Sequence, residues 1–269
     1  MENLKIVAIQ YDIVWENKSA NFKKLEEQFF SKFKSNTHDL ILLPEMFATG
    51  FTMNPSVFYE EEDGETFEWL KERAKQTNAC IGAGIITSNK NGGFLNTFVI
   101  VRPNGNLEYY YKRHLFRMGE ENRHYVSGNT VKIIEINGWK INLQVCYDLR
   151  FPTFARNAIN DKSETLYDVL VYIANWPEVR TAAWTALLRA RAIENQAYVC
   201  GVNRVGKDGN QVNHAGASAI INPLGGYLCD TVYKHEVAIE SSLNFEDLSK
   251  ARTVFPVLLD ADRFIITDK

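Results

Sequence analysis

Long apolar segments and cysteines are scarce in this sequence of 269 residues. No apolar run approaches the ~18 to 20 residues that a transmembrane helix needs, and no basic stretch followed by a long apolar one opens the chain. A membrane-bound or secreted protein is therefore not expected. The cysteines show no C-x-x-C pair and no regular spacing, which is typical of free thiols in a reducing compartment: Cys80, Cys146, Cys200 and Cys229. We expect a cytoplasmic location.

An excess of positive charge is also missing, since 30 Lys and Arg stand against 33 Asp and Glu. General nucleic-acid-binding proteins are usually basic, so no nucleic-acid partner is expected. The five histidines form neither an H-E-x-x-H motif nor a pair at i, i+4 spacing, which argues against a metal site. Residues 201–207 match the start of a phosphate-binding loop, but Asp208 replaces the required Ser or Thr, and we interpret this match as chance.

Short apolar strands and a few amphipathic helices dominate the pattern. The predicted strands are Lys5–Gln10, Leu40–Leu43, Ala79–Ile86, Thr97–Arg102, Leu107–Lys112, Val131–Ile136, Lys140–Cys146, Val169–Ala174, Ala197–Asn203, Ser218–Asn222 and Val237–Glu240. The predicted helices are Ala20–Lys34, Thr66–Gln76, Phe154–Ile159, Ala182–Asn195 and Phe245–Ala251. Several strands are apolar on both faces and must be covered on both sides. We expect a layered α/β protein with two stacked mixed sheets and outer helices, in one domain over residues 1–269.

Two charged residues stand directly at strand ends, where the loops of α/β proteins carry chemistry. Pro44 stops a buried strand and fixes the position of Glu45, which suits a general base. Lys112 ends an aromatic-rich strand, where a buried ammonium beside a carboxylate could stabilise an oxyanion. Each residue taken alone is also compatible with a purely structural role, as a surface glutamate or a lysine at a strand edge.

A third strand end carries Cys146, followed by a break before the predicted helix Phe154–Ile159. A cysteine at a strand-to-helix turn meets the positive end of the helix, so we expect a lowered thiol pKa. The backbone N–H of Tyr147 would then be free to bind an oxyanion. The alternative is a small buried residue at a strand end. Together, however, Glu45, Lys112 and Cys146 form a complete acyl-transfer set of base, oxyanion stabiliser and nucleophile.

The motifs around these residues resemble those of the nitrilase, or carbon–nitrogen hydrolase, superfamily. They are Leu-Pro-Glu45-Met-Phe, Tyr-Lys112-Arg-His-Leu-Phe and Val-Cys146-Tyr-Asp-Leu-Arg-Phe-Pro, in the family's order, and the resemblance continues through residues 167–177, 188–195 and 216–225. It implies a four-layer αββα sandwich, commonly a homodimer, without a metal or an organic cofactor. It also implies that Glu45 is the base, Lys112 the oxyanion partner and Cys146 the nucleophile. Glu121 fits the family's second glutamate, with Glu120 as the alternative.

Within the superfamily, the sequence looks most like the ω-amidase branch, whose enzymes hydrolyse the terminal amide of 2-oxo acids such as 2-oxoglutaramate and 2-oxosuccinamate. A small-molecule amide of this kind carries a carboxylate, so the pocket should offer a cation or backbone donors. Arg150 and Arg117 lie near motif positions, although either could instead be a structural ion-pair partner. Phe116 and Trp176 are candidates for the pocket wall, with a role in the core as the alternative.

Two other functions remain open at this point. A nitrilase or an N-carbamoyl amide hydrolase would use the same three residues on a different substrate. A non-catalytic interaction protein on the same scaffold is a further alternative, against which the presence of all three residue types argues.

Overall fold

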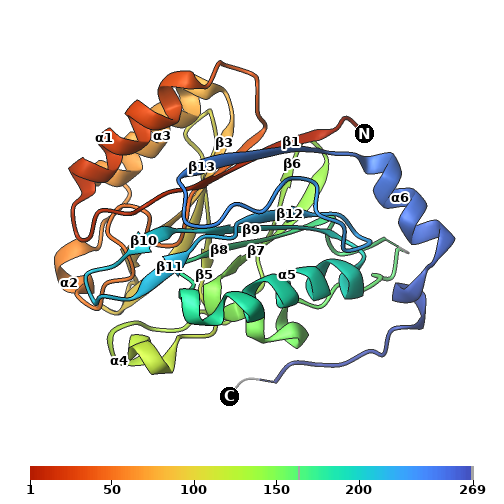
Figure 1. Cartoon of the computed structure of the whole chain (residues 1–269). Coiled ribbons are helices and arrows are strands. Elements are labelled where there is room, and N and C mark those ends of the chain that lie inside the picture. Colours follow the sequence, from red (N-terminus) through yellow and green to blue (C-terminus); the bar gives the residue numbers. More distant parts are fainter. Residues whose placement is uncertain (163, 268–269) are drawn as a thin grey trace.

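The computed structural model describes residues 1–162 and 164–267 (Figure 1). Six strands form the first sheet, in the order β13 (Val237–Leu243), β1 (Leu4–Gln10), β2 (Leu40–Leu42), β3 (Cys80–Ser88), β4 (Phe94–Val101) and β5 (Leu107–Tyr111). The central pairs β1–β2 and β2–β3 are parallel and the others are antiparallel. Apolar residues on both faces of β1 enter two different core clusters, so this sheet is covered on both sides.

Five strands form the second sheet, in the order β12 (Ala219–Ile221), β9 (Tyr198–Asn203), β8 (Val169–Ala174), β7 (Trp139–Val145) and β6 (Ile133–Ile136). The pairs β7–β8 and β8–β9 are parallel. Every residue of β8 is buried, as the uninterrupted apolar run predicts for a strand covered on both faces.

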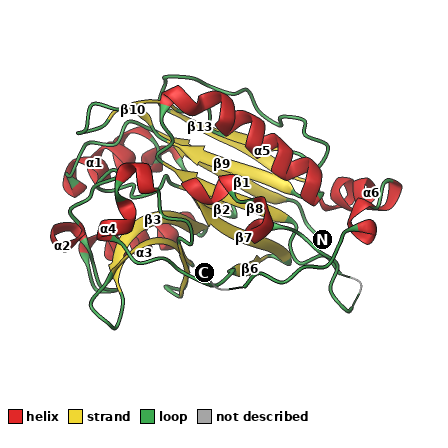
Figure 2. Cartoon of the chain, turned by 90° about the horizontal axis from the view of Figure 1, so that it is seen from below, coloured by secondary structure: helices red, strands yellow, loops and turns green. Residues whose placement is uncertain are grey.

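Helices cover the outer face of each sheet (Figures 1 and 2). α1 (Lys18–Gln28) and α3 (Glu65–Thr77) share a core cluster with one face of the first sheet. α5 (Thr181–Asn195) buries Trp184 and Leu188 in the cluster that also joins the two sheets to each other. The remaining helices are the short α2 (Pro55–Phe58) and α4 (Glu121–His124), and α6 (Phe245–Val254). The predicted arrangement of two stacked mixed sheets with outer helices is confirmed.

Two local predictions are wrong. Instead of a helix over Phe154–Ile159 there is a 3₁₀ turn, Pro152–Ala155. The backbone N–H of Asn157 donates to the Asn195 side chain at 2.9 Å, and its own amide donates to Tyr167 O at 3.0 Å, so tertiary bonds replace helical ones here. The first predicted helix ends earlier, at Gln28, and is followed by a separate 3₁₀ turn.

A hairpin of β10 (Val205–Lys207) and β11 (Asn213–Ala215) was not predicted. The segment that resembles a phosphate-binding loop lies in β9 and β10, where the Arg204 side chain is buried and pairs with Asp12 at 2.8 Å. No helix in the described ranges is long and apolar enough to cross a membrane. All four cysteines are free thiols.

Candidate active site

The three predicted residues come together from strand ends of both sheets. Glu45 follows β2 and Lys112 follows β5 in the first sheet, whereas Cys146 follows β7 in the second. Their exposed fractions are 0%, 1% and 8%. An ionised carboxylate and an ammonium at this depth require each other as partners, because burying either charge alone is costly.

Lys112 binds two carboxylates. Its Nζ lies 2.8 Å from Glu45 Oε1, and 3.0 and 2.9 Å from the two oxygens of Glu121. Burial alone lowers the pKa of the Lys112 ammonium, but the charges of Glu121 and Glu45 outweigh it and raise that pKa above its ordinary value. Burial also raises the pKa of Glu121, against the opposing effect of Lys112. Glu120, the alternative to Glu121, is exposed and pairs with Arg123.

Two asparagines that were not predicted as site residues hold the carboxylates in place. Asn96 on β4 donates from Nδ2 to Glu45 Oε1 at 2.8 Å and to Glu121 Oε1 at 2.7 Å. The backbone N–H of Asn175, directly after β8, donates to Glu45 Oε2 at 2.9 Å. The sequence contains a signal for Asn96, because the polar pair Asn96 and Thr97 interrupts an otherwise apolar buried strand.

Gly84 on β3 lets the Glu45 segment approach the sheet. A Cβ at this position would lie 2.5 Å from both the Cα of Glu45 and the backbone N of Met46. Because the obstacle is backbone, no rotation of a side chain relieves it. Gly84 therefore belongs to the architecture of the site although it carries no reactive group.

The Cys146 thiol differs from the prediction. Burial, followed by the charge of Glu45 and a hydrogen bond to it, raises the Cys146 pKa well above its ordinary value. The expected lowering by a helix terminus is wrong, because Cys146 begins only a five-residue 3₁₀ helix, Cys146–Arg150, and burial outweighs so short a dipole. The residue has a φ of 45°, an uncommon conformation for a non-glycine residue that points to a functional constraint.

The buried side chain of Asp148 stabilises the turn that carries Cys146. Its buried carboxylate accepts hydrogen bonds from the backbone N–H of Val145 at 3.0 Å and from the hydroxyl of Tyr110 at 2.7 Å. It also accepts from the backbone N–H of His114 at 2.9 Å and contacts Nδ1 of the same ring at 2.7 Å. Asp148 thus links the segment that carries Lys112 to the turn that carries Cys146. The sequence pattern alone indicates no role for it.

A cavity of about 1020 Å³ opens over Cys146. The predicted residues Tyr147, Phe116, Trp176 and Arg150 all line it. The ring of Phe116 packs edge-on against that of Tyr147, with centroids 5.2 Å apart. The other predicted arginine, Arg117, is exposed and is not part of the lining. Arg180, which was not predicted as a site residue, does line the cavity.

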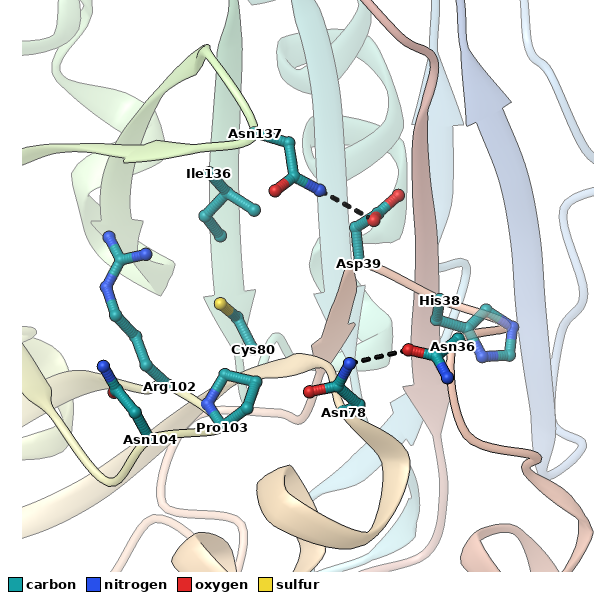
Figure 3. A pocket seen from close by; sticks show the side chains of 10 residues that line it. All are labelled: Asn36, His38, Asp39, Asn78, Cys80, Arg102, Pro103, Asn104, Ile136 and Asn137. Atoms are coloured by element: carbon teal, nitrogen blue, oxygen red, sulfur yellow. Dashed lines mark hydrogen bonds between the residues drawn. The ribbon is translucent and has the colours of Figure 1, made fainter.

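A second cavity, of about 410 Å³, lies at the opposite end of β2 and β3 from Glu45 (Figure 3). Its amide side chains already have partners, since Asn137 donates to Asp39 at 2.8 Å and Asn78 to Asn36 at 2.6 Å. Burial raises the pKa of the Cys80 thiol beside them, which makes it unreactive. These residues shape turns and suggest no chemistry. No cluster of three or more His, Cys, Asp or Glu in the described part of the chain is arranged to hold a metal ion.

The fold and the site thus bring a buried cysteine, two glutamates and a lysine together at the meeting point of two sheets. Residues 5–252 match the model of the carbon-nitrogen hydrolase family. The chain belongs to this family.

Several relatives match nearly the whole chain. An ω-amidase of Escherichia coli, YafV, is 42% identical, over 98% of this chain and 99% of its own. A 2-oxoglutaramate amidase of Bacillus subtilis is 33% identical, over 95% of this chain and 96% of its own. A solved carbon–nitrogen hydrolase superfamily structure from Xanthomonas campestris, with an arsenic adduct in its active site, is 37% identical, covers 99% of this chain and 100% of its own, and has a TM-score of 0.95.

Proposed function

We propose that this protein hydrolyses the terminal amide of small carboxylates, above all the ω-amides of 2-oxo acids such as 2-oxoglutaramate and 2-oxosuccinamate. The observation that carries the proposal is the buried contact of Lys112 with Glu45 and Glu121 beside the Cys146 thiol. The names of the E. coli and B. subtilis relatives support the same substrate class.

The first half of the reaction forms a thioester. Glu45 accepts the thiol proton as Cys146 Sγ attacks the amide carbon, so that the carbonyl oxygen becomes an oxyanion. The Lys112 ammonium contacts Glu45 Oε1 and both oxygens of Glu121, so that one N–H shared between the two Glu121 oxygens leaves the third N–H for this oxyanion. The N–H of Tyr147 lies in the first turn of the 3₁₀ helix, where backbone donors have no helical partner, and it supplies a second bond.

The second half releases the product. Glu45 returns its proton to the leaving nitrogen, the C–N bond breaks and ammonia departs. A water molecule that Glu45 deprotonates then attacks the thioester, and the acid leaves as the proton returns to sulfur. Glu121 does not touch the reacting atoms in this scheme and instead fixes the Lys112 ammonium. The chemistry needs no cofactor.

The test is ammonia release from 2-oxosuccinamate and 2-oxoglutaramate by the wild type and by Cys146→Ala. Fast release by the wild type alone is the expected result. Full turnover by Cys146→Ala would refute the mechanism. Release from nitriles or N-carbamoyl amino acids in place of the 2-oxo amides would instead support the alternative use of the same residues, as a nitrilase or N-carbamoyl amide hydrolase. An intact fold with no turnover on any of these would favour a non-catalytic binding protein.

We further propose that residues 1–269 act as one catalytic domain in a cytoplasmic homodimer. The four free thiols support the location. Exposed apolar side chains near the C-terminus support self-association: Val254, Phe255, Leu259 and Ile265. Sedimentation equilibrium of the wild type and of Phe255→Ser tests the dimer, and a wild type that stays monomeric at micromolar concentration would exclude it.

A further inference from the structure

The charges that line the Cys146 cavity do not balance. Its carboxylates are already engaged: Glu178 pairs with Lys234 at 2.6 Å and Glu120 with Arg123. Asp208 accepts from the backbone N–H groups of residues 210 and 212, both at 2.9 Å. By contrast, the guanidinium groups of Arg150 and Arg180 form no ion pair with any described residue; each lies over an aromatic ring instead. The cavity therefore offers a ligand two cations that have no ionic partner among the described residues, and an anion is the ligand group that would bind them.

Arg180 has the better environment for binding that anion. It is half-buried, and its guanidinium carbon lies 5.7 Å from the centre of the Phe116 ring. Its Nη2 donates to Met118 Sδ at 2.8 Å, and a thioether is a weak acceptor that a carboxylate easily replaces. Its carbonyl accepts from Trp176 Nε1 at 2.8 Å, which fixes its backbone beside the cavity.

Arg180 is also connected to the reaction centre through Phe116. That residue's backbone N–H donates to Glu121 Oε2 at 2.6 Å, and its ring packs against Tyr147, the residue that follows the nucleophile. The guanidinium is thus held on the same aromatic wall that flanks Cys146. A ligand anchored there by one end would place its other end toward the sulfur.

Arg150 differs from Arg180 in its surroundings. Its guanidinium carbon lies 5.1 Å from the Trp176 ring, but the side chain is exposed. Water screens an exposed charge, so an ion pair there contributes little to binding, whereas a half-buried guanidinium held by neighbours loses less solvation and less freedom. The two arginines therefore differ in their expected effect on the same ligand.

We propose that Arg180 binds the carboxylate of the substrate and so selects amides that carry an acid at the far end of the chain. This inference rests on the proposed amidase function. It assigns to Arg180 the role that the sequence had suggested for Arg150 or Arg117. Its planar fork matches a carboxylate with two parallel hydrogen bonds, a geometry that a lysine cannot reproduce.

The test compares two amides of equal length, succinamate with its carboxylate and butyramide without one. The measured quantity is the ratio of kcat/KM for succinamate to that for butyramide. We expect Arg180→Gln to lower this ratio about 100-fold, mainly through KM for succinamate, because a bidentate charged pair is lost. Arg180→Lys should lower it less, and Arg150→Gln should change it by less than about 5-fold. Arg117→Gln is the matched control and should leave it unchanged.

Binding without turnover separates this inference from the amidase proposal. Calorimetric titration of succinate into Cys146→Ala should give a dissociation constant that rises about 100-fold when Arg180→Gln is added. An active wild type with an unchanged substrate ratio in Arg180→Gln would overturn the role of Arg180 alone. An equal loss on both amides would also overturn it, since that pattern marks a structural role. A wild type inactive on every amide would overturn the amidase proposal, whatever the succinate titration shows.

Discussion

The carboxylate of Asp148 accepts a hydrogen bond from the backbone N–H of Val145 at 3.0 Å, directly before the nucleophile. The same carboxylate binds His114, two residues after Lys112. One buried side chain therefore sets the position of Cys146 relative to Lys112, across the boundary between the two sheets. Because Cys146 has a positive φ, this bond also helps to hold an unfavourable backbone conformation in place.

Asp148→Asn should therefore impair catalysis through positioning. The amide keeps one acceptor oxygen but turns an NH₂ group toward N–H or O–H donors, and unsatisfied buried groups cost about 1–3 kcal/mol each. We expect kcat to fall at least 10-fold with little change in KM. Tyr110→Phe removes one of the four contacts of Asp148 and leaves its charge in place. Its kcat should therefore fall much less than that of Asp148→Asn. Unaltered rates of both turnover and Cys146 alkylation in Asp148→Asn would contradict this role.

Gly84→Ala should displace the general base. The added Cβ would meet the backbone of Glu45 at 2.5 Å, so this segment must shift, and a shift of about 1 Å can cost 100-fold in rate. Gly82→Ala on the same strand is the matched control, because its Cβ would meet the side chains of Leu42 and Phe98 instead. We expect both variants to lose thermal stability. Only Gly84→Ala should show a fall in kcat larger than its loss of stability explains. Equal kcat in the two variants would contradict the argument.

Glu45→Gln should separate turnover from thiol reactivity. After burial, Glu45 is the largest contributor to the raised Cys146 pKa, so its removal lowers that pKa and increases the thiolate fraction at a given pH. We therefore expect faster alkylation by iodoacetamide at pH 8, while amide turnover falls about 10²- to 10⁴-fold with the loss of the base. In the wild type, alkylation should be slow at pH 7 and rise with pH. Slower alkylation of the variant would show that the charge of Glu45 does not oppose the thiolate.

Lys112→Met should change how stability depends on pH. In the wild type the raised Lys112 pKa stabilises the folded state below the ordinary lysine value of 10.5, and this contribution is lost as the pH rises above it. Without the ammonium, the pKa of the already raised Glu121 carboxyl increases further, so the folded state holds a proton that the unfolded state releases. The free energy of unfolding should then fall as the pH rises above the ordinary glutamate value of 4.5, by up to about 1.4 kcal/mol per pH unit.

The control for this experiment is Lys112→Met combined with Glu121→Gln. Replacing Glu121 by an amide removes the titrating group, so the double variant should lose much of the slope, although both variants are expected to be inactive. Urea denaturation at several pH values measures the effect. The same slope in the single and the double variant would exclude Glu121 as its source.

Sequence by itself determined the residues whose roles depend on local chain geometry. Glu45, Lys112 and Cys146 each stand at the end of a recognisable strand, and the strand pattern indicated the two stacked sheets that bring these ends together. Local sequence failed where tertiary bonds compete with local ones. Residues 154–159 do not form a helix, because Asn157 is bonded to distant backbone groups.

Only the tertiary structure decided what surrounds those three residues. Burial raises the pKa of Cys146, although its position at a strand-to-helix turn predicted the opposite. Asn96 and Gly84 contact the Glu45 segment, and Asp148 contacts Tyr110, so all three act on residues far away in the sequence, and their spacing along the chain does not indicate these contacts. Arg180 reaches the cavity from the 3₁₀ turn Glu178–Arg180 directly before α5, and its guanidinium lies over the ring of Phe116. Burial and long-range contacts depend on how the whole chain packs. The reactive residues could therefore be predicted from the sequence, whereas their surroundings could not.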